Sequence, residues 1–214
     1  MKRAVIFANG NMSNFVRIKK IISKNDYIIG VDGGSEHAIK EGFIPNVIIG
    51  DFDSISLSAQ KKLSKHKILR IEYPQKKDKT DFELAIEFAL KKKYKEIIIC
   101  GLLGNRVDHF LANIFFLKRI YLQNQSLKVK IIEGNQEAVF TSGELELYGK
   151  AGDLVSLIPL DTTIKDIEFY GLEYKLKNES LFFGSTRGVS NVMIKKSAKI
   201  IIKRGTILVV YTVI

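Results

Sequence analysis

The 214-residue sequence contains no tryptophan, a single cysteine and only three prolines. The lone cysteine, Cys100, excludes an internal disulfide and suits a reducing compartment, so we expect a cytoplasmic protein. No apolar stretch approaches the roughly 18 residues that a membrane-spanning helix requires, which excludes a transmembrane protein and a membrane partner. The short apolar run over residues 4–8 meets a polar Asn-Gly-Asn sequence, and we expect it to form a strand rather than a signal peptide.

Positive charge is what the sequence has in excess. It carries 34 Lys and Arg against 23 Asp and Glu, a formal net charge of +11, and the larger part of this excess lies in residues 1–125. Such a charge suits an anionic small substrate such as a nucleotide, a nucleic acid, or solubility alone. The lysines cluster on apparent helices without interleaved aromatic residues for base stacking, so we expect no nucleic-acid partner.

The first 125 residues alternate short β-rich runs with amphipathic segments. The predicted strands are Ala4–Ala8, Tyr27–Val31, Val47–Gly50, Ile68–Glu72 and Glu96–Cys100. The predicted helices lie near Asn14–Lys24, Ser35–Glu41, Ser56–His66, Thr80–Lys92 and Val107–Leu122. This alternation predicts an α/β fold with an open parallel sheet of the Rossmann type, covered by helices on both faces.

After about residue 127 the pattern changes to short β-like runs punctuated by glycines. The predicted strands there are Val129–Glu133, Ala138–Thr141, Leu154–Pro159, Thr163–Phe169, Leu172–Leu176, Val189–Ile194, Ala198–Ile202 and Thr206–Val213. Many short strands at close spacing predict an antiparallel β-sandwich or barrel. We therefore expect two domains, an α/β domain over residues 1–125 and a β-sandwich domain over residues 126–214.

Polar residues and glycines follow every predicted strand of the first domain. Ligands of open α/β sheets bind beyond the carboxyl ends of the strands, where the strand order reverses. The segments in question are Asn9-Gly10-Asn11, Asp32-Gly33-Gly34, Gly50-Asp51-Phe52-Asp53-Ser54, residues 73–81 and residues 101–109. Their shared position predicts an active site at this edge of the sheet.

Asp51 and Asp53 are the first candidates for a metal site. Because they are two residues apart, their carboxylates point to the same side if the chain is extended. Carboxylate oxygens suit Mg²⁺, which keeps several waters and takes phosphate oxygens as its remaining ligands. Such a pair by itself is more typical of a solvated turn. The presence of Asp32 and Asp81 at the same predicted edge favours the metal site.

The sequence Thr80-Asp81-Phe82-Glu83 has the pattern of a capping box, which predicts that a helix begins here. Asp81 then occupies the first helical position, where free N–H groups and the helix dipole favour anions. The preceding lysines, including Lys77, either neutralise phosphate charge or form an exposed basic loop.

The segment from Gly101 to Arg106 is a glycine-bearing loop between a strand and a helix, which suits a close approach of backbone to phosphate. It matches neither the dinucleotide-binding fingerprint nor the P-loop. Arg106 offers a bidentate fork for phosphate. Asn105 or Asp108 is expected to cap the following helix, and His109 and Cys100 are expected to be structural.

Taken in order, these motifs resemble those of the thiamine pyrophosphokinase (thiamine diphosphokinase) family. The resemblance runs from residue 9 to the C-terminus. Its motifs are Asp32-Gly33-Gly34, Gly50-Asp51-Phe52-Asp53-Ser54, Lys77-Asp78-Lys79-Thr80-Asp81 with Glu83 and Ala85, and Gly101, Gly104, Arg106, Asp108 and His109. A later element, Ser185-Thr186-Arg187-Gly188-Val189-Ser190-Asn191, is similar to the family's thiamine-side segment.

The resemblance implies transfer of the terminal diphosphate of ATP to the hydroxyethyl oxygen of thiamine, giving thiamine diphosphate and AMP. It implies an α/β nucleotide-binding catalytic domain followed by a thiamine-binding β-sandwich. Asp51, Asp53 and Asp81 are implied as Mg²⁺ ligands, and Asp32 as a carboxylate that joins the metal shell or orients the nucleophile. The residues implied around ATP are Asn9, Gly10, Lys77, Thr80, Gly104, Arg106 and Asp108. Ser190 and Asn191 are implied around thiamine.

The resemblance also implies a homodimer with thiamine at the interface between subunits. The sequence departs from the family pattern at Asn105, where many members have a second glycine, and in its lack of the tryptophan on which some relatives stack thiamine. Two alternatives stay open: another Mg²⁺-dependent phosphotransferase or phosphohydrolase acting on a small molecule, and, less favoured, a non-enzymatic RNA-binding module.

Overall fold

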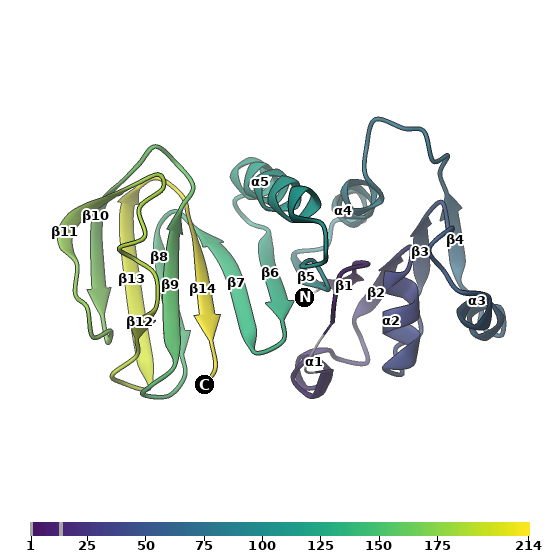
Figure 1. The fold of residues 1–214 in the computed structure, drawn as a ribbon, viewed down its shortest axis with the longest axis horizontal. Coiled ribbons are helices and arrows are strands. Elements are labelled where there is room, and N and C mark those ends of the chain that lie inside the picture. Colours follow the sequence, from purple (N-terminus) through teal and green to yellow (C-terminus); the bar gives the residue numbers. More distant parts are fainter. Residues whose placement is uncertain (1, 13–14) are drawn as a thin grey trace. The chain divides into compact units, whose positions relative to one another are not determined.

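The computed structural model describes residues 2–12 and 15–214 (Figure 1). It divides into two compact units, unit 1 over residues 1–134 and unit 2 over residues 135–214. The boundary expected after residue 125 falls before strand β6 (Lys128–Glu133). In the structure β6 pairs in parallel with β5 (Glu96–Cys100), so that this strand belongs to the sheet of unit 1.

Unit 1 contains a parallel sheet with the strand order β6-β5-β1-β2-β3-β4. Besides β5 and β6, its strands are β1 (Arg3–Phe7), β2 (Tyr27–Val31), β3 (Val47–Gly50) and β4 (Leu69–Glu72). The chain runs from β1 outward to β4 and then returns to place β5 on the other side of β1, in register Val5↔Ile98. The strand order therefore reverses between β1 and β5, the position at which ligands of such sheets bind.

The helices that the structure describes in unit 1 cover the two faces of this sheet, as expected for buried parallel strands (Figure 1). They are α1 (Phe15–Ile21), α2 (Gly34–Lys40), α3 (Leu57–Leu63), α4 (Asp81–Lys91) and α5 (Val107–Gln123). Ile18 of α1 and Ala38 of α2 pack with Val5, Ile28 and Ile98 of one face. α4 and α5 lie over the other face (Figure 1). Within residues 2–12 and 15–214, no helix is both long and apolar enough to cross a membrane.

Unit 2 is a β-sandwich of two antiparallel sheets, which confirms the predicted fold class. One sheet has the order β12-β9-β14-β7 and the other β11-β10-β13-β8. The strands are β7 (Gln136–Thr141), β8 (Glu144–Tyr148), β9 (Leu154–Pro159), β10 (Thr163–Tyr170), β11 (Lys177–Phe182), β12 (Asn191–Val192), β13 (Ser197–Arg204) and β14 (Ile207–Thr212). Alternate residues such as Val155, Ile167, Ile200 and Val209 point between the sheets and form one core.

Two edge strands of unit 2 were not predicted from the sequence. The predicted strand Leu172–Leu176 is wrong: Leu172 and Leu176 are buried in the core, but the segment between them belongs to no strand. The strand β11 follows it instead, with a mostly polar sequence that gives little β signal. The strand β8 was missed although Leu145 and Leu147 pack against the core, because its alternation covers only five residues.

The buried carboxylate of Asp153 anchors the C-terminal end of unit 2. It accepts hydrogen bonds from the Tyr211 hydroxyl and from the backbone N–H groups of Lys150 and Ile214. Burial acts to raise the pKa of Asp153, but these three donors outweigh it and hold the pKa below the ordinary value of 3.8. The ionised carboxylate therefore stabilises the folded state above about pH 4, and this stabilisation is lost as the pH falls through the lowered pKa.

We predict that Asp153→Asn lowers the free energy of unfolding near pH 7 by about 2 kcal/mol, since hydrogen bonds to a charged acceptor contribute about 1.5–3 kcal/mol each. The difference from the wild type should shrink as the pH falls below 4, because the wild-type carboxylate becomes protonated as the pH falls through its lowered pKa. Urea denaturation at pH 7 and at pH 3 measures both values. Glu173→Gln, which changes an exposed carboxylate of the same unit, is the control; an equal loss there, or a pH-independent difference, contradicts the anchoring role.

Candidate active site

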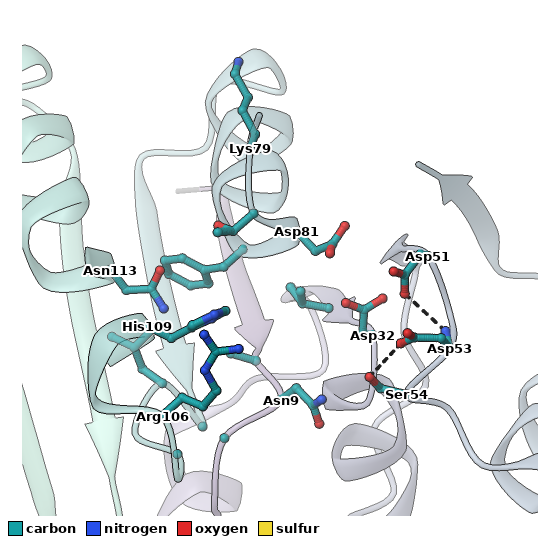
Figure 2. A pocket seen from close by; sticks show the side chains of 18 of the residues that line it. Asn9, Asp32, Asp51, Asp53, Ser54, Lys79, Asp81, Arg106, His109 and Asn113 are labelled. Carbon is teal, nitrogen blue, oxygen red and sulfur yellow. Dashed lines mark hydrogen bonds between the residues drawn. The ribbon is translucent and has the colours of Figure 1, made fainter. Parts of the chain in front are cut away.

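A cavity of about 700 Å³ opens in unit 1 at the carboxyl ends of β1, β2, β3 and β5 (Figure 2). Almost all the unit 1 site residues predicted from the sequence line it: Asn9, Gly10, Asp32, Asp51, Asp53, Lys77, Thr80, Asp81, Gly104 and Arg106. Asp108 is not among the lining residues, and Ser190 and Asn191 belong to unit 2. The cavity thus joins segments that are separated by up to about a hundred residues of sequence, because parallel strands end at the same edge of the sheet.

Asp32 stands at the end of β2 in a left-handed conformation, with φ of 44°. Its Oδ1 accepts a hydrogen bond of 3.2 Å from the backbone N–H of Phe52. The backbone of Gly50 lies against this carboxylate. The φ of Gly50 is +147°, and a Cβ at this position would lie only 1.6 Å from Oδ1 of Asp32. Only glycine permits this approach, so the end of β3 is shaped around the Asp32 carboxylate.

The protonation of Asp32 is set by its surroundings. Burial, and after it the nearby Asp81 and Asp51 carboxylates, together raise the pKa of its carboxyl to about 7, while the Phe52 N–H opposes the rise. Like charges gathered in one partly desolvated cavity repel one another. The cavity therefore favours the arrival of positive charge.

Asp51 and Asp53 lie in a tight loop rather than in extended chain, so the predicted extended geometry is wrong. Phe52 between them has φ of 65°, and Asp51 accepts the backbone N–H of Asp53 at 3.2 Å as in an Asx turn (Figure 2). Asp53 accepts from the Ser54 hydroxyl at 2.9 Å and from Nε2 of Gln75 at 3.1 Å. The contribution of Gln75 was not predicted, because it depends on the 73–80 loop folding back over the strand ends.

The predicted helix start at Thr80 is confirmed: its hydroxyl accepts the backbone N–H of Glu83 at 3.2 Å, and Asp81 is the first residue of α4. Nζ of Lys77 lies 2.9 Å from Oδ1 of Asp81, and both side chains are less than one-fifth exposed. Lys77 also donates to the carbonyl of Pro74 at 3.0 Å. Lys79, in contrast, extends along α4 to an exposed ion pair with Glu87 (Figure 2).

The donor set around the cavity is chemically suited to Mg²⁺. Across residues 2–12 and 15–214, no three His, Cys, Asp or Glu side chains are placed to hold a metal together. Asp51, Asp53 and Asp81 nevertheless line the same cavity, and Oδ1 of Asp81 is buried without a hydrogen bond beside its Lys77 partner. Because Mg²⁺ binds through one or two carboxylates together with substrate phosphates and waters, these residues fit that ion.

The opposite wall of the cavity is formed by the segment between β5 and α5. Arg106 places its guanidinium against the exposed Asp108 carboxylate, with contacts of 3.1 and 2.5 Å. Asp108 therefore forms an ion pair with Arg106 instead of capping α5. The hydrogen bonds from Arg106 lower the pKa of Asp108 to about 2. His109 and Asn113 lie one helical turn apart and both face the cavity (Figure 2). Asn113 was missed from the sequence, and its spacing of four from His109 was the available signal.

The loops after β1 and β5 are joined backbone to backbone. The N–H groups of Gly10 and Asn11 donate to the carbonyls of Gly101 and Leu103, both at 2.8 Å. A Cβ on Gly10 would lie 2.4 Å from the carbonyl oxygen of Gly101 and 2.5 Å from that of Leu103. Glycine at position 10 is thus what allows the two loops to meet.

Asn191 of unit 2 is buried, and its side chain is engaged by the neighbouring backbone. Its Nδ2 donates to the carbonyl of Tyr174 at 2.7 Å, and its Oδ1 accepts the N–H of Tyr174 at 3.0 Å. Ser190 is exposed, with φ of 58°, and its N–H donates to the hydroxyl of Ser156. The Ser-Asn segment therefore presents Ser190 on the surface and fixes the backbone beside the exposed ring of Tyr174.

Two family models match the chain in the same order as its two units. The model described as the catalytic domain of thiamin pyrophosphokinase matches residues 18–131, more than half of the chain. The model described as its vitamin B1 binding domain matches residues 144–207. The chain belongs to the thiamin pyrophosphokinase family. Formation of thiamine diphosphate from thiamine and ATP is therefore its activity, and neither the alternative phosphotransferase nor the RNA-binding module is favoured.

Relatives of this family are similar to the chain over almost its whole length. The thiamine pyrophosphokinase of Bacillus subtilis (strain 168) is 30% identical over 212 residues, covering 98% of each chain. The thiamin pyrophosphokinase 1 of Caenorhabditis elegans is 25% identical over 86% of this chain and 81% of its own length. A crystal structure of the Bacillus subtilis enzyme superimposes with a TM-score of 0.90, at 27% identity and with full coverage of both chains.

We predict that Gly10→Ala lowers the rate of thiamine diphosphate formation at least tenfold and the stability by about 1–3 kcal/mol, since the added methyl group forces the two loops apart. Steady-state turnover and thermal unfolding measure the two effects. Gly143→Ala is the matched control, because a Cβ there meets nothing within 4 Å. Wild-type turnover in Gly10→Ala would show that the contact between the loops is not needed by the enzyme.

Proposed function

We propose that the cavity of unit 1 is the ATP site of this enzyme. The observation that supports this most is the arrangement of opposite charges around one cavity: Asp32, Asp51 and Asp81 lie on one side and Arg106 on the other (Figure 2). A nucleotide with bound Mg²⁺ presents both signs of charge, because its phosphates are anionic and its metal is cationic. The glycine loops at Gly10 and Gly104 allow the phosphates to approach the backbone closely.

We propose Asp51, Asp53 and Asp81 as the residues that hold Mg²⁺. When bound, Mg²⁺ supplies charge neutralisation to the transferred phosphates. The hydrogen bonds from Ser54 and Gln75 orient the Asp53 carboxylate, and Lys77 holds Asp81 at the start of α4. Each of these contacts lowers the entropy that the carboxylates lose on binding the ion, which is the role of outer-shell partners in metal sites.

In the proposed reaction, the hydroxyethyl oxygen of thiamine attacks the β-phosphorus of ATP. A new O–P bond forms, and the bond from the β-phosphorus to the oxygen that bridges it to the α-phosphorus breaks. AMP leaves with that oxygen, and the proton of the hydroxyl group is released to water. Phosphoryl-type transfer requires positioning and charge neutralisation more than covalent participation by the protein. We assign Lys77 and Arg106 to the phosphates and Asp32 to the orientation of the hydroxyl group. Asn9 and Thr80 complete the proposed nucleotide contacts, and Asp108 acts through its ion pair with Arg106.

We propose that thiamine binds beside the Ser190-Asn191 segment of unit 2. Ser190 is exposed and offers a hydroxyl group to the ligand, whereas Asn191 acts by holding the backbone at Tyr174. The Tyr174 side chain is 66% exposed and is an aromatic surface next to this segment in a chain that lacks tryptophan. An aromatic ring in this position suits the flat rings of thiamine.

We also propose a homodimer with thiamine at the interface between subunits. The exposed face of α5 supports it, because Val107, Leu111, Phe115 and Leu122 recur at helical spacing and are each 46–69% exposed. An exposed apolar stripe of this length on a helix is typical of a surface that a partner covers. A two-fold dimer would cover it in both subunits and create two equivalent sites.

We predict that Asp81→Asn retains the fold but lowers turnover at least about 100-fold, since loss of even an outer-shell partner costs 10–100-fold at metal sites. The concentration of Mg²⁺ needed for half-maximal activity should also rise, because a neutral amide binds a hard cation weakly. Asp166→Asn is the control: it makes the same change in unit 2 at a φ of 53°, which asparagine also adopts. Unchanged Mg²⁺ dependence in Asp81→Asn would remove Asp81 from the metal site.

We predict that Asp81→Asn and Asn191→Ala, each inactive alone, regain activity when their subunits exchange. If each site combines unit 1 of one subunit with unit 2 of the other, every heterodimer carries one intact site, which gives about a quarter of the wild-type activity after statistical exchange. Sedimentation measures the mass, and differently tagged subunits report the exchange. Proven exchange without recovered activity, or a fully active monomer of 24.2 kDa, contradicts the shared site.

A further inference from the structure

Glu133 is a charged residue near the cavity that neither the motifs nor the proposed reaction uses. It is the last residue of β6, which pairs with β5 in the register Cys100↔Ile132. The Glu133 side chain therefore extends just beyond Cys100, where the chain leaves the sheet and begins the segment 101–106. That segment carries Gly104 and Arg106 of the cavity.

The carboxylate of Glu133 is bound to the backbone of this segment. Its Oε1 accepts hydrogen bonds from the consecutive N–H groups of Leu102 and Leu103, the second at 2.8 Å. Burial raises the pKa of the Glu133 carboxyl to about 7, and these two N–H groups oppose the rise. The Glu133 carboxylate is thus partly removed from water, and two backbone N–H groups replace the hydrogen bonds that it would make with water.

The same segment is held from its other side by the loop after β1. There the carbonyls of Gly101 and Leu103 accept the N–H groups of Gly10 and Asn11. The side-chain amide of Asn11 also donates to Oδ1 of Asn105 at 3.0 Å. The backbone N–H groups of the segment thus bind Glu133, and its backbone carbonyls bind the loop after β1. Hydrogen bonds on both sides therefore hold the backbone of the segment in one conformation.

Two consecutive N–H groups that point at one spot form a small anion-binding site. Glu133 fills that site with a carboxylate of the protein itself, so a phosphate group is not attracted there. Without Glu133 the two donors would be left without their acceptor, and the segment would rearrange to satisfy them. Any rearrangement moves Gly104 and Arg106 relative to the carboxylates on the opposite wall.

We propose that Glu133 is a positioning residue of the ATP site: by holding the N–H groups of Leu102 and Leu103, it sets the course of the segment that presents Gly104 and Arg106 to the phosphates. This inference rests on the proposed location of ATP in the cavity of unit 1. Glu133 touches neither substrate in this arrangement, and its effect should therefore be on nucleotide affinity rather than on thiamine affinity.

The test compares three substitutions at this position by steady-state kinetics with each substrate varied in turn. Glu133→Ala removes the acceptor, and we expect the KM for ATP to rise at least tenfold, which corresponds to about 1.4 kcal/mol, the lower part of the cost of one unsatisfied donor. Glu133→Gln keeps an oxygen in the same place and should return the KM for ATP to within about threefold of the wild type. Glu133→Asp, one methylene shorter, should be intermediate. The KM for thiamine should stay within about twofold throughout, since neither donor belongs to the thiamine segment.

Two further variants separate this inference from the assignment of the ATP site. Glu72→Gln changes the exposed last residue of β4, another parallel strand of the sheet, and should behave as the wild type. Arg106→Ala tests the site itself and should raise the KM for ATP. If Arg106→Ala has this effect and Glu133→Ala does not, the positioning role is wrong while the ATP site stands. If neither has it, the proposed ATP site is wrong.

Hydrogen exchange gives a readout that does not depend on turnover. In Glu133→Ala the amides of Leu102 and Leu103 should exchange faster, while the amides of β5 keep their protection. If the whole of unit 1 loses protection, the Glu133→Gln and Glu133→Asp variants decide the question through their KM for ATP. Equal rises in the KM values for ATP and thiamine, or unchanged exchange at positions 102 and 103, overturn the proposal.

Discussion

The parallel pairing of β1 with β5 is the contact on which the architecture of unit 1 depends. Because β1 starts the chain at the middle of the sheet, the next three strands extend to one side and β5 and β6 to the other. All six strands run in the same direction, so the loops that leave β1, β2, β3 and β5 reach one edge. The backbone contacts of Gly10 and Asn11 with Gly101 and Leu103 continue this pairing beyond the strands and shape the cavity.

Several carboxylates lie close together in the cavity, and the protein offsets only part of the electrostatic and desolvation free energy that this arrangement costs. Asp32 is raised in pKa by burial and by its acidic neighbours, and the Phe52 N–H offsets only part of this effect. Asp81 has Lys77 as its partner, and Asp53 has two neutral donors. A site that keeps negative charge together in this way is expected to bind a cation with its substrate. Glu133 differs from these carboxylates, because two backbone N–H groups donate to it and its charge holds the loop after β5 instead of binding the ligand.

The extent to which the fold could be predicted differs between the two units. In unit 1 the strands β2, β3 and β5 have the residue bounds expected from the sequence, because strands buried on both faces read as uninterrupted apolar runs. In unit 2 the central strand β9 was found with its bounds, but the edge strands β8 and β11 were not. An edge strand has fewer apolar contacts, so its sequence carries a weaker signal.

The site was predicted in composition but not in detail. The residues after each strand pointed to one edge, and Asp32, Asp51, Asp81 and Arg106 do line one cavity. The sequence could not show that Phe52 adopts a left-handed conformation, that Asn191 is bound to the backbone of Tyr174, or that Arg106 is paired with Asp108. Each of these features depends on a turn geometry or a contact, and the local sequence is equally compatible with several backbone conformations.

By itself, the sequence determined the kind of sheet, the edge at which its polar residues collect and the family to which the chain belongs. Strand periodicity and the order of motifs are local properties of the chain, which is why they can be read along it. Only the tertiary structure decided that Gln75, Asn113 and Glu133 take part in the site. Glu133 lies 30 residues beyond Leu103 and contacts it only because β6 pairs with β5. A contact between distant residues is a property of strand order, and strand order is decided by packing of the whole unit.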